Sequence, residues 1–164
     1  MKLASYFLLL FFAFSSVVAS SLPAHIFNYN PAFDLFTACS PMHIHVTVGY
    51  LVGDPDNPEI IKSEKRQREL TALVKRRLVA ARLYQERAEN YFKIDMLVQL
   101  DGTLTLSLNF EKLLYDRATQ SWDHASTWHV DLRPTESGLI LALSNVLDFF
   151  LEQYVASNKN RCSP

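Results

Sequence analysis

The chain has 164 residues and a formal net charge of −1, with 49% hydrophobic and 20% charged residues. This length and this balance indicate a single folded domain with one hydrophobic core. The near neutrality argues against a general nucleic-acid-binding protein, because such proteins carry a large positive charge.

A secretory signal peptide is predicted at the N-terminus. One lysine, Lys2, is followed by an apolar run over residues 6–14 and then by small residues ending in SSVVAS. This is the order of regions in a signal peptide, which we expect to span residues 1–19 with cleavage after Ala19. The apolar run is too short to span a bilayer unless it stays as an uncleaved anchor, which the sequence leaves open. We therefore expect a secreted or periplasmic protein, of either bacterial or eukaryotic origin.

Residues 20–41 are predicted to form an irregular N-terminal segment, because the stretch is aperiodic and is interrupted by Pro23 and Pro31. The chain has two cysteines, Cys39 near the end of this segment and Cys162 near the C-terminus. An even number of cysteines in an exported protein favours a disulfide between them, with two free thiols as the alternative. We expect no catalytic role for either cysteine, because no Cys-x-x-Cys motif activates them.

The first strand and the first helix follow this segment. From His43 the stretch HIHVTVGY alternates polar and apolar residues with a period of two, as in a half-buried strand. The turn residues of GDPDNPE, at 53–59, end this strand. Residues 60–87 contain no glycine or proline, and their leucine, valine and alanine residues recur at helical spacing. This pattern predicts a long amphipathic helix.

Three more strands and a second helix are predicted downstream. Residues 92–100 and 104–111 alternate with a period of two, and Asp101 and Gly102 between them are typical of a hairpin turn. The stretch SWDHASTWHVDL, at 121–132, is rich in strand-forming residues. Pro134 suits the first turn of a helix, and the apolar stripe that follows predicts a helix ending at Asn158.

The predicted order is strand, helix, three strands, helix. One crossover and a meander give an α+β fold, a two-layer sandwich in which a four-stranded, mostly antiparallel sheet carries both helices on one face. We expect a single α+β domain over residues 42–158, followed by a C-terminal tail at 159–164. The other face of the sheet then remains for water, for the N-terminal segment or for a partner.

Polar side chains of the predicted strands share that second face, because residues two apart in a strand point the same way. We expect it to carry His43, His45, Lys93 and Asp95, together with His124 or His129 according to the register of the fourth strand. The structural interpretation of His-x-His is the polar face of a strand. The alternative is a metal site, because imidazole and carboxylate groups are metal ligands. Its candidate ligands are His43, His45, Asp95 and His129.

Two further features of the sequence are candidate binding surfaces. Trp122 and Trp128 lie in an aromatic stretch that suggests a platform for a carbohydrate or a peptide, although both rings could instead pack in the core. The first predicted helix carries nine basic residues against three acidic ones over residues 62–87. A stripe of this kind can meet an anionic membrane. We favour a solvated helix face instead, because the charges are distributed around the helix.

The chain resembles a loosely defined family of small exported bacterial proteins of unknown function. The resemblance rests on four stretches, VKRRLVAARLY at 74–84, LLYD at 113–116, STWH at 126–129 and LDFFLEQYVASNKNRC at 147–162. It implies export and a strand-helix-strand-strand-strand-helix domain, and it implies no chemistry. Relatives carry several glycines before the last helix, whereas VDLRPTESG here contains only Gly138. A function borne by that loop is therefore not implied for this chain.

Together these patterns predict an exported, non-enzymatic binding or accessory protein that acts through a sheet face or an edge strand. The sequence contains no nucleophile elbow, phosphate-binding glycine loop or His-Glu-x-x-His motif. We expect no cofactor and no nucleic acid, and we expect the partner to be another protein or a second subunit of the same chain. The alternative function is a metal-binding protein or a metal-assisted hydrolase that uses the strand histidines.

Overall fold

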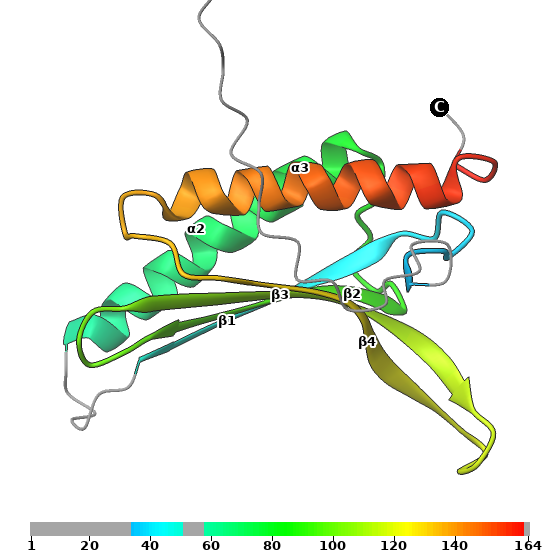
Figure 1. Ribbon diagram of the computed structural model, residues 1–164, viewed down its shortest axis with the longest axis horizontal. Coiled ribbons are helices and arrows are strands. Elements are labelled where there is room, and N and C mark those ends of the chain that lie inside the picture. Colours follow the sequence, from blue (N-terminus) through cyan, green and yellow to red (C-terminus); the bar gives the residue numbers. More distant parts are fainter. Residues whose placement is uncertain (1–33, 51–57, 163–164) are drawn as a thin grey trace, which may run out of the picture.

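The computed structural model describes residues 34–50 and 58–162 (Figure 1). The predicted signal peptide, most of the N-terminal segment, residues 51–57 with most of the predicted turn at 53–59, and the last two residues lie outside this described part.

Four strands and two helices follow one another in the predicted order. They are β1 (Met42–Tyr50), α2 (Pro58–Ala80), β2 (Asn90–Val98), β3 (Leu104–Asp116), β4 (Ser121–Leu132) and α3 (Leu139–Asn158). The strands form one sheet in the order β1-β2-β3-β4, in which β1 and β2 are parallel and the other pairs are antiparallel. Both helices lie on the same side of the sheet (Figure 1). The predicted α+β sandwich is confirmed.

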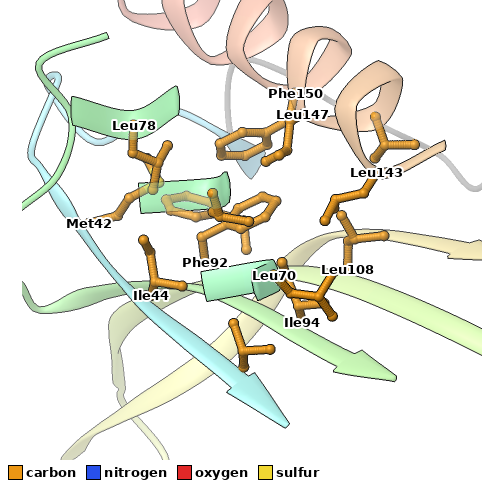
Figure 2. Close-up of a cluster of buried hydrophobic side chains, with 14 of the residues drawn as sticks. Met42, Ile44, Leu70, Leu78, Phe92, Ile94, Leu108, Leu143, Leu147 and Phe150 are labelled. Atoms are coloured by element: carbon orange, nitrogen blue, oxygen red, sulfur yellow. The ribbon is translucent and has the colours of Figure 1, made fainter. Parts of the chain in front are cut away.

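The core lies between this helical layer and the sheet. Strand register aligns the inward-facing apolar residues into rows, so that Ile44, Phe92 and Phe110 lie side by side across three strands. These residues alternate with polar ones, as the period-two pattern predicts. Figure 2 shows Phe150 of α3 and Leu70 of α2 meeting this surface from the helical layer. Each fully buried side chain of this size contributes about 1.5–3 kcal/mol to folding.

Helix α3 is long and apolar enough to span a bilayer by length and composition alone. Its buried residues pack into the sheet core, however, and include Leu143, Leu147 and Phe150 (Figure 2). In this fold one side of α3 therefore packs against the sheet.

The first helix is shorter than the sequence predicts. It ends at Ala80, and the expected continuation toward Arg87 consists of turns and an isolated bridge between Tyr84 and Met42. The amide of Leu83 donates to the carbonyl oxygen of Leu78 at 2.8 Å. The amide of Arg82 donates to the carbonyl oxygen of Val79 at 3.0 Å. These two bonds form a Schellman motif, in which the residue after the helix adopts a left-handed conformation. Arg82 does so with φ 58°. The residues after Ala80 therefore still have helix-forming composition, although the helix ends there and the backbone changes direction.

The second helix begins later than Pro134 suggests. It starts at Leu139, and the amide of Gly138 donates to the Oγ1 and the carbonyl oxygen of Thr135 at 3.2 and 3.1 Å. This turn, and not the proline, sets the start of the helix. The expectation that Pro134 occupies a first helical turn is wrong.

Strands β3 and β4 extend beyond the other two strands as a two-stranded arm. The pairing of β2 with β3 stops at Tyr91 and Glu111, whereas β3 and β4 remain paired to Asp116 and Ser121. We call residues 112–116 of β3 and 121–125 of β4 the arm. Figure 1 shows the arm turning away from the helices, toward the uncovered side of the sheet. A β-bulge lies at its base, where the register shifts between Phe110 and Glu111.

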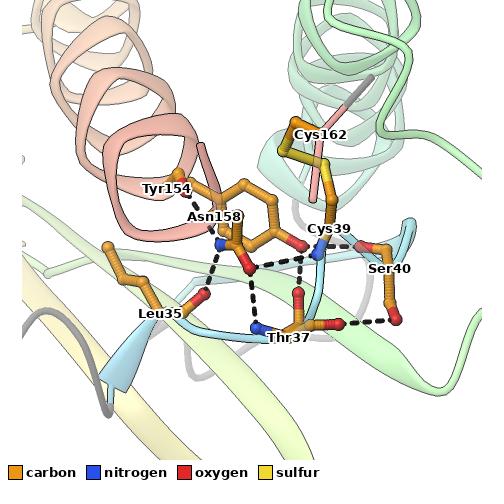
Figure 3. The surroundings of a disulfide bond; sticks show 7 residues. All are labelled: Leu35, Thr37, Cys39, Ser40, Tyr154, Asn158 and Cys162. Carbon is orange, nitrogen blue, oxygen red and sulfur yellow. Dashed lines mark hydrogen bonds between the residues drawn. A yellow bond between two sulfur atoms is a disulfide. The ribbon is translucent and has the colours of Figure 1, made fainter. Parts of the chain in front are cut away.

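A disulfide joins the two ends of the described chain, as predicted. Cys39 and Cys162 are bonded, with their Cα atoms 5.1 Å apart and 123 positions apart in the sequence (Figure 3). Beside it, the hydroxyl of Tyr154 donates to the carbonyl oxygen of Ser40 at 2.6 Å. The segment before β1 is thereby fixed to the C-terminal end of α3.

The side chain of Asn158 completes this junction, and it is 1% exposed. Its Oδ1 accepts from the amides of Thr37 and Cys39 at 2.9 and 3.0 Å. Its Nδ2 donates to the carbonyl oxygens of Leu35 and Tyr154 at 2.9 and 2.8 Å (Figure 3). A buried amide needs such partners, because an unpaired polar group in the interior is costly.

Candidate functional site

The side of the sheet opposite the helices is the candidate functional surface, and we call it the open face. Its side chains alternate with the buried residues of the same strands. The strand residues that make up the open face are His43, His45, Thr47, Tyr91, Lys93, Asp95, Leu97, Thr105, Ser107, Asn109, Glu111, Leu113, Tyr115, Trp122, His124, Ser126, His129 and Asp131. Four of the predicted candidates, His43, His45, Lys93 and Asp95, therefore share this surface.

The bulge brings both remaining histidines to the open face, where the sequence predicts only one. His124 and His129 are five positions apart, and an odd separation in a regular strand places side chains on opposite faces. Phe110 pairs with Trp128 and Glu111 pairs with Ser126, so Thr127 is the extra residue of β4. Because of this extra residue, the side chains of His124 and His129 lie on the same face of the sheet.

Tyr91 connects the histidines at the base of the arm. The ring of His124 lies 4.5 Å from that of Tyr91, centroid to centroid, and the ring of His43 lies 6.1 Å from it on an edge. His124 Nε2 is also 2.8 Å from the carbonyl oxygen of Glu89. Tyr91 belongs to the same alternation as Lys93, and that pattern would have identified it from the sequence.

His129 belongs to a second polar cluster on the open face. Its Nδ1 is 2.7 Å from Oδ1 of Asn109, and its Nε2 is 2.9 Å from Oδ2 of Asp131. The hydroxyl of Ser107 donates to the other oxygen of Asp131 at 2.5 Å. The pKa of the Asp131 carboxyl lies below its ordinary value, mainly because Ser107 donates a hydrogen bond to it. Partial burial opposes this effect, and smaller contributions from His129 and Arg133 add to it.

This cluster positions polar groups and does not assemble a nucleophile with its base. Ser107 donates to the carboxylate of Asp131 and not to the imidazole of His129. A serine nucleophile is activated by a base that takes its proton directly. These three residues therefore do not have the arrangement of a serine activated by a histidine base.

Lys93 lines a depression on the open face. Its Nζ is 3.3 Å from Oδ2 of Asp95 and 3.9 Å from Oε1 of Glu111. The depression has a volume of about 330 Å³ and is lined by His45, Tyr91, Lys93 and Glu111. It offers hydrogen-bond donors, acceptors and an aromatic ring within one small area, as a recognition site requires.

The predicted metal ligands are not brought together. His45, Lys93, Asn109 and His129 occupy one cross-strand row, so the two histidines stand on opposite edges of the sheet. Three strand spacings separate them, which is about 14 Å. Within residues 34–50 and 58–162, no group of three His, Cys, Asp or Glu side chains lies close enough to hold a metal ion.

The two tryptophans have opposite environments. Trp128 is 4% exposed, its ring lies 5.1 Å from that of Phe150, and its Nε1 donates to Gln153 at 3.3 Å. Its place in the predicted binding platform is therefore wrong, because it is a core residue. Trp122 is 65% exposed on the arm, where its ring lies 5.4 Å from that of Tyr115. The platform that remains is this cross-strand pair.

The two edges of the sheet differ in how they are covered. At β1 the amide of Met42 donates to Leu83 at 2.7 Å, and the side chain of Gln67 donates to the carbonyl oxygen of Val46 at 2.7 Å. These bonds occupy part of the edge that a partner strand would need. At β4 the hydroxyl of Thr127 donates to the carbonyl oxygen of Asp34 at 2.6 Å.

A scan against protein-family models and a search of curated proteins gave no match to this chain.

Proposed function

We propose that this chain is an exported, non-enzymatic binding or accessory protein of the bacterial periplasm or cell exterior, and that it acts through the open face. The observation that carries the proposal is the asymmetry of the sheet. The helices bury one face, whereas the other presents hydrogen-bonded polar side chains around a depression of about 330 Å³. The partner is another protein or a second copy of the chain.

The disulfide supports the proposed compartment. Disulfides persist in secreted and periplasmic proteins and are rare in the reducing cytosol. The bond between Cys39 and Cys162 agrees with the signal peptide expected at residues 1–19 and with the resemblance to exported proteins. Mass spectrometry of the protein isolated from its native host should find Ser20 as the first residue. An intact Met1 on exported protein would show that the signal is retained.

Site-specific photo-crosslinking in the native host tests the binding surface. A photoreactive amino acid replaces Thr47, which is exposed on the open face, or Arg76, which is exposed on α2. We expect a discrete crosslinked product from position 47 alone, and its loss when Lys93→Glu is added. Equal products from both positions, or none from position 47, would contradict a binding role for the open face.

A further inference from the structure

The side chains that line the depression have unused hydrogen-bonding capacity. Within the residues that the structure describes, the ring of His45 and the hydroxyl of Tyr91 form no hydrogen bond. The carboxylate of Glu111 has one ionic partner there, Lys93 at 3.9 Å, and a carboxylate can accept several hydrogen bonds. The cluster around His129 differs, because its polar groups bond one another. The depression is therefore the part of the open face whose polar groups still need partners.

The charges around the depression argue for an uncharged ligand. Lys93 repels a cation, whereas Asp95 and Glu111 repel an anion. An apolar ligand would remove water from these charged groups without replacing its hydrogen bonds, which is costly. A neutral ligand with hydroxyl groups avoids both penalties, because a hydroxyl donates to a carboxylate and accepts from an ammonium group.

Tyr91 adds an aromatic surface to these polar groups. Its side chain lines the depression, and its ring contacts the rings of His124 and His43 at centroid distances of 4.5 and 6.1 Å. An aromatic ring offers a large apolar contact area and loses little entropy when it binds. A sugar ring has C–H bonds on its faces and hydroxyls around its rim. It therefore matches an aromatic surface that stands beside polar groups.

We propose that the depression binds one ring of a neutral oligosaccharide, which packs against Tyr91 and bonds through its hydroxyls to Glu111, Lys93 and His45. This inference rests on the proposed function, because it names a ligand of the same surface. The volume of about 330 Å³ lies at the lower end of the range for small-molecule sites, about 300–1,000 Å³. A site of this size suits a single sugar ring.

The arm offers a second aromatic surface for the sugar units that follow. The rings of Tyr115 and Trp122 lie 5.4 Å apart, centroid to centroid, and both side chains are exposed. Tyr115 is four residues beyond Glu111 in β3, which corresponds to at most about 13 Å of strand. Figure 1 shows that the arm turns toward the side of the sheet that holds the depression. An oligosaccharide of several rings can therefore contact both surfaces.

A glycan array probed with the full exported protein, with its disulfide intact, tests the class of ligand. The array carries neutral and acidic oligosaccharides. We expect binding to neutral glycans and not to acidic ones, because Asp95 and Glu111 repel an anionic group. An array on which no neutral glycan binds, or on which acidic glycans bind better, would overturn the proposal.

Isothermal titration calorimetry with a neutral oligosaccharide that binds on the array tests the location of the site. Glu111→Gln should weaken binding about tenfold, because hydrogen bonds to a charged carboxylate are roughly twice as strong as those between neutral groups. Glu152→Gln is the matched control, because it removes one carboxylate from an exposed position on α3, on the other side of the sheet. This control should leave the affinity unchanged. Equal affinities of the wild type and Glu111→Gln would place the ligand elsewhere and overturn the proposal.

Trp122→Ser tests the contribution of the arm. It should weaken the oligosaccharide about fivefold, as expected for one aromatic contact, because the longer ligand reaches the exposed pair. The same variant should bind the corresponding monosaccharide as the wild type does, because a single ring occupies only the depression. An unchanged affinity for the oligosaccharide would contradict the second surface.

The two proposals fail separately. If position 47 crosslinks a protein in the host and no neutral glycan binds, the sugar site is wrong and the open face remains a surface for that protein. If a neutral glycan binds and Glu111→Gln weakens it, but position 47 yields no protein product, the ligand is a free glycan and the proposed protein partner is wrong. If neither is found, both proposals fail.

Discussion

Asn158 illustrates how one buried amide can hold the two ends of a chain together. Thr37 and Cys39 donate to its Oδ1, and Ala38 and Cys39 adopt left-handed φ values of 54° and 63° that turn the backbone there. Such values are uncommon for residues other than glycine. The N-terminal segment therefore depends on this side chain for a backbone conformation that it does not favour by itself.

Replacing Asn158 should destabilise the fold strongly. Asn158→Ala leaves the amides of Thr37 and Cys39 and the carbonyl oxygen of Leu35 without this partner. A single unsatisfied buried group costs about 1–3 kcal/mol. We expect a loss of about 2–4 kcal/mol in the free energy of unfolding, measured by urea denaturation with the disulfide intact. Asn145→Ala, at an exposed position of the same helix, should change stability by less than about 0.5 kcal/mol. Similar losses for the two variants would contradict the role of the buried amide.

Asp131 should contribute to stability in a pH-dependent way. Its pKa in the folded protein lies below the ordinary value of 3.8, because Ser107 and His129 bond its carboxylate. The contribution is therefore complete above that value and is lost as the pH falls through the lower folded pKa. Asp131→Asn should cost less than about 1 kcal/mol at neutral pH, since the side chain is mostly exposed.

Urea unfolding at neutral pH and near pH 2 measures this dependence. The difference between the wild type and Asp131→Asn should shrink toward zero at the lower pH. A matched substitution on the arm, Asp123→Asn, controls for the loss of one carboxylate. A difference between wild type and Asp131→Asn that stays constant with pH would show that the carboxylate charge has no part in it.

At the scale of elements, the end of α2 offers a direct test of the Schellman motif. Arg82 occupies its left-handed position with φ 58°, where glycine has no steric cost. Arg82→Gly should therefore stabilise the protein by up to about 1 kcal/mol. The same change inside the helix, Arg76→Gly, should destabilise it by about 1 kcal/mol. Thermal unfolding monitored by circular dichroism compares the two, and a loss of stability in both would contradict the assignment.

The sequence predicted the existence of every described element better than its ends. Alternation with a period of two located β1, β2 and β3, because one face of each strand is buried under helices. The ends depend on contacts that have no periodic signal. The turn after Ala80 follows from backbone bonds to Leu78 and Val79, and the start of α3 follows from the turn at Thr135.

At the scale of the whole molecule, the disulfide closes most of the described chain into one loop. The bond between Cys39 and Cys162 spans 123 positions. A loop of this size stabilises by up to about 5 kcal/mol in the chain-entropy model, and measured values are typically about 2–4 kcal/mol. The double variant Cys39→Ala and Cys162→Ala should lose about 2–4 kcal/mol in urea unfolding. A reductant should destabilise the wild type by a similar amount and leave the double variant unchanged. Equal stability of the oxidised wild type and the double variant would contradict this role.

The sequence predicted which residues share the candidate surface, but it did not predict how far apart they lie on it. The sequence placed His43, His45, Lys93 and Asp95 on one face, because strand alternation depends only on neighbouring residues. It could not give the distance between His45 and His129, because that distance depends on strand order. The sheet puts β1 and β4 at opposite edges, which separates them.

By itself, the sequence determined the order of the elements, the α+β class and the polar face of the sheet, and it favoured the pairing of its two cysteines. These properties follow from periodicity and composition, which the chain carries locally. Only the tertiary structure decided that Trp128 is buried while Trp122 is exposed, and that His124 and His129 share a face. Both outcomes come from the bulge at Thr127 and the arm beyond it. They depend on how β3 and β4 pair, and no local pattern in either strand specifies that pairing.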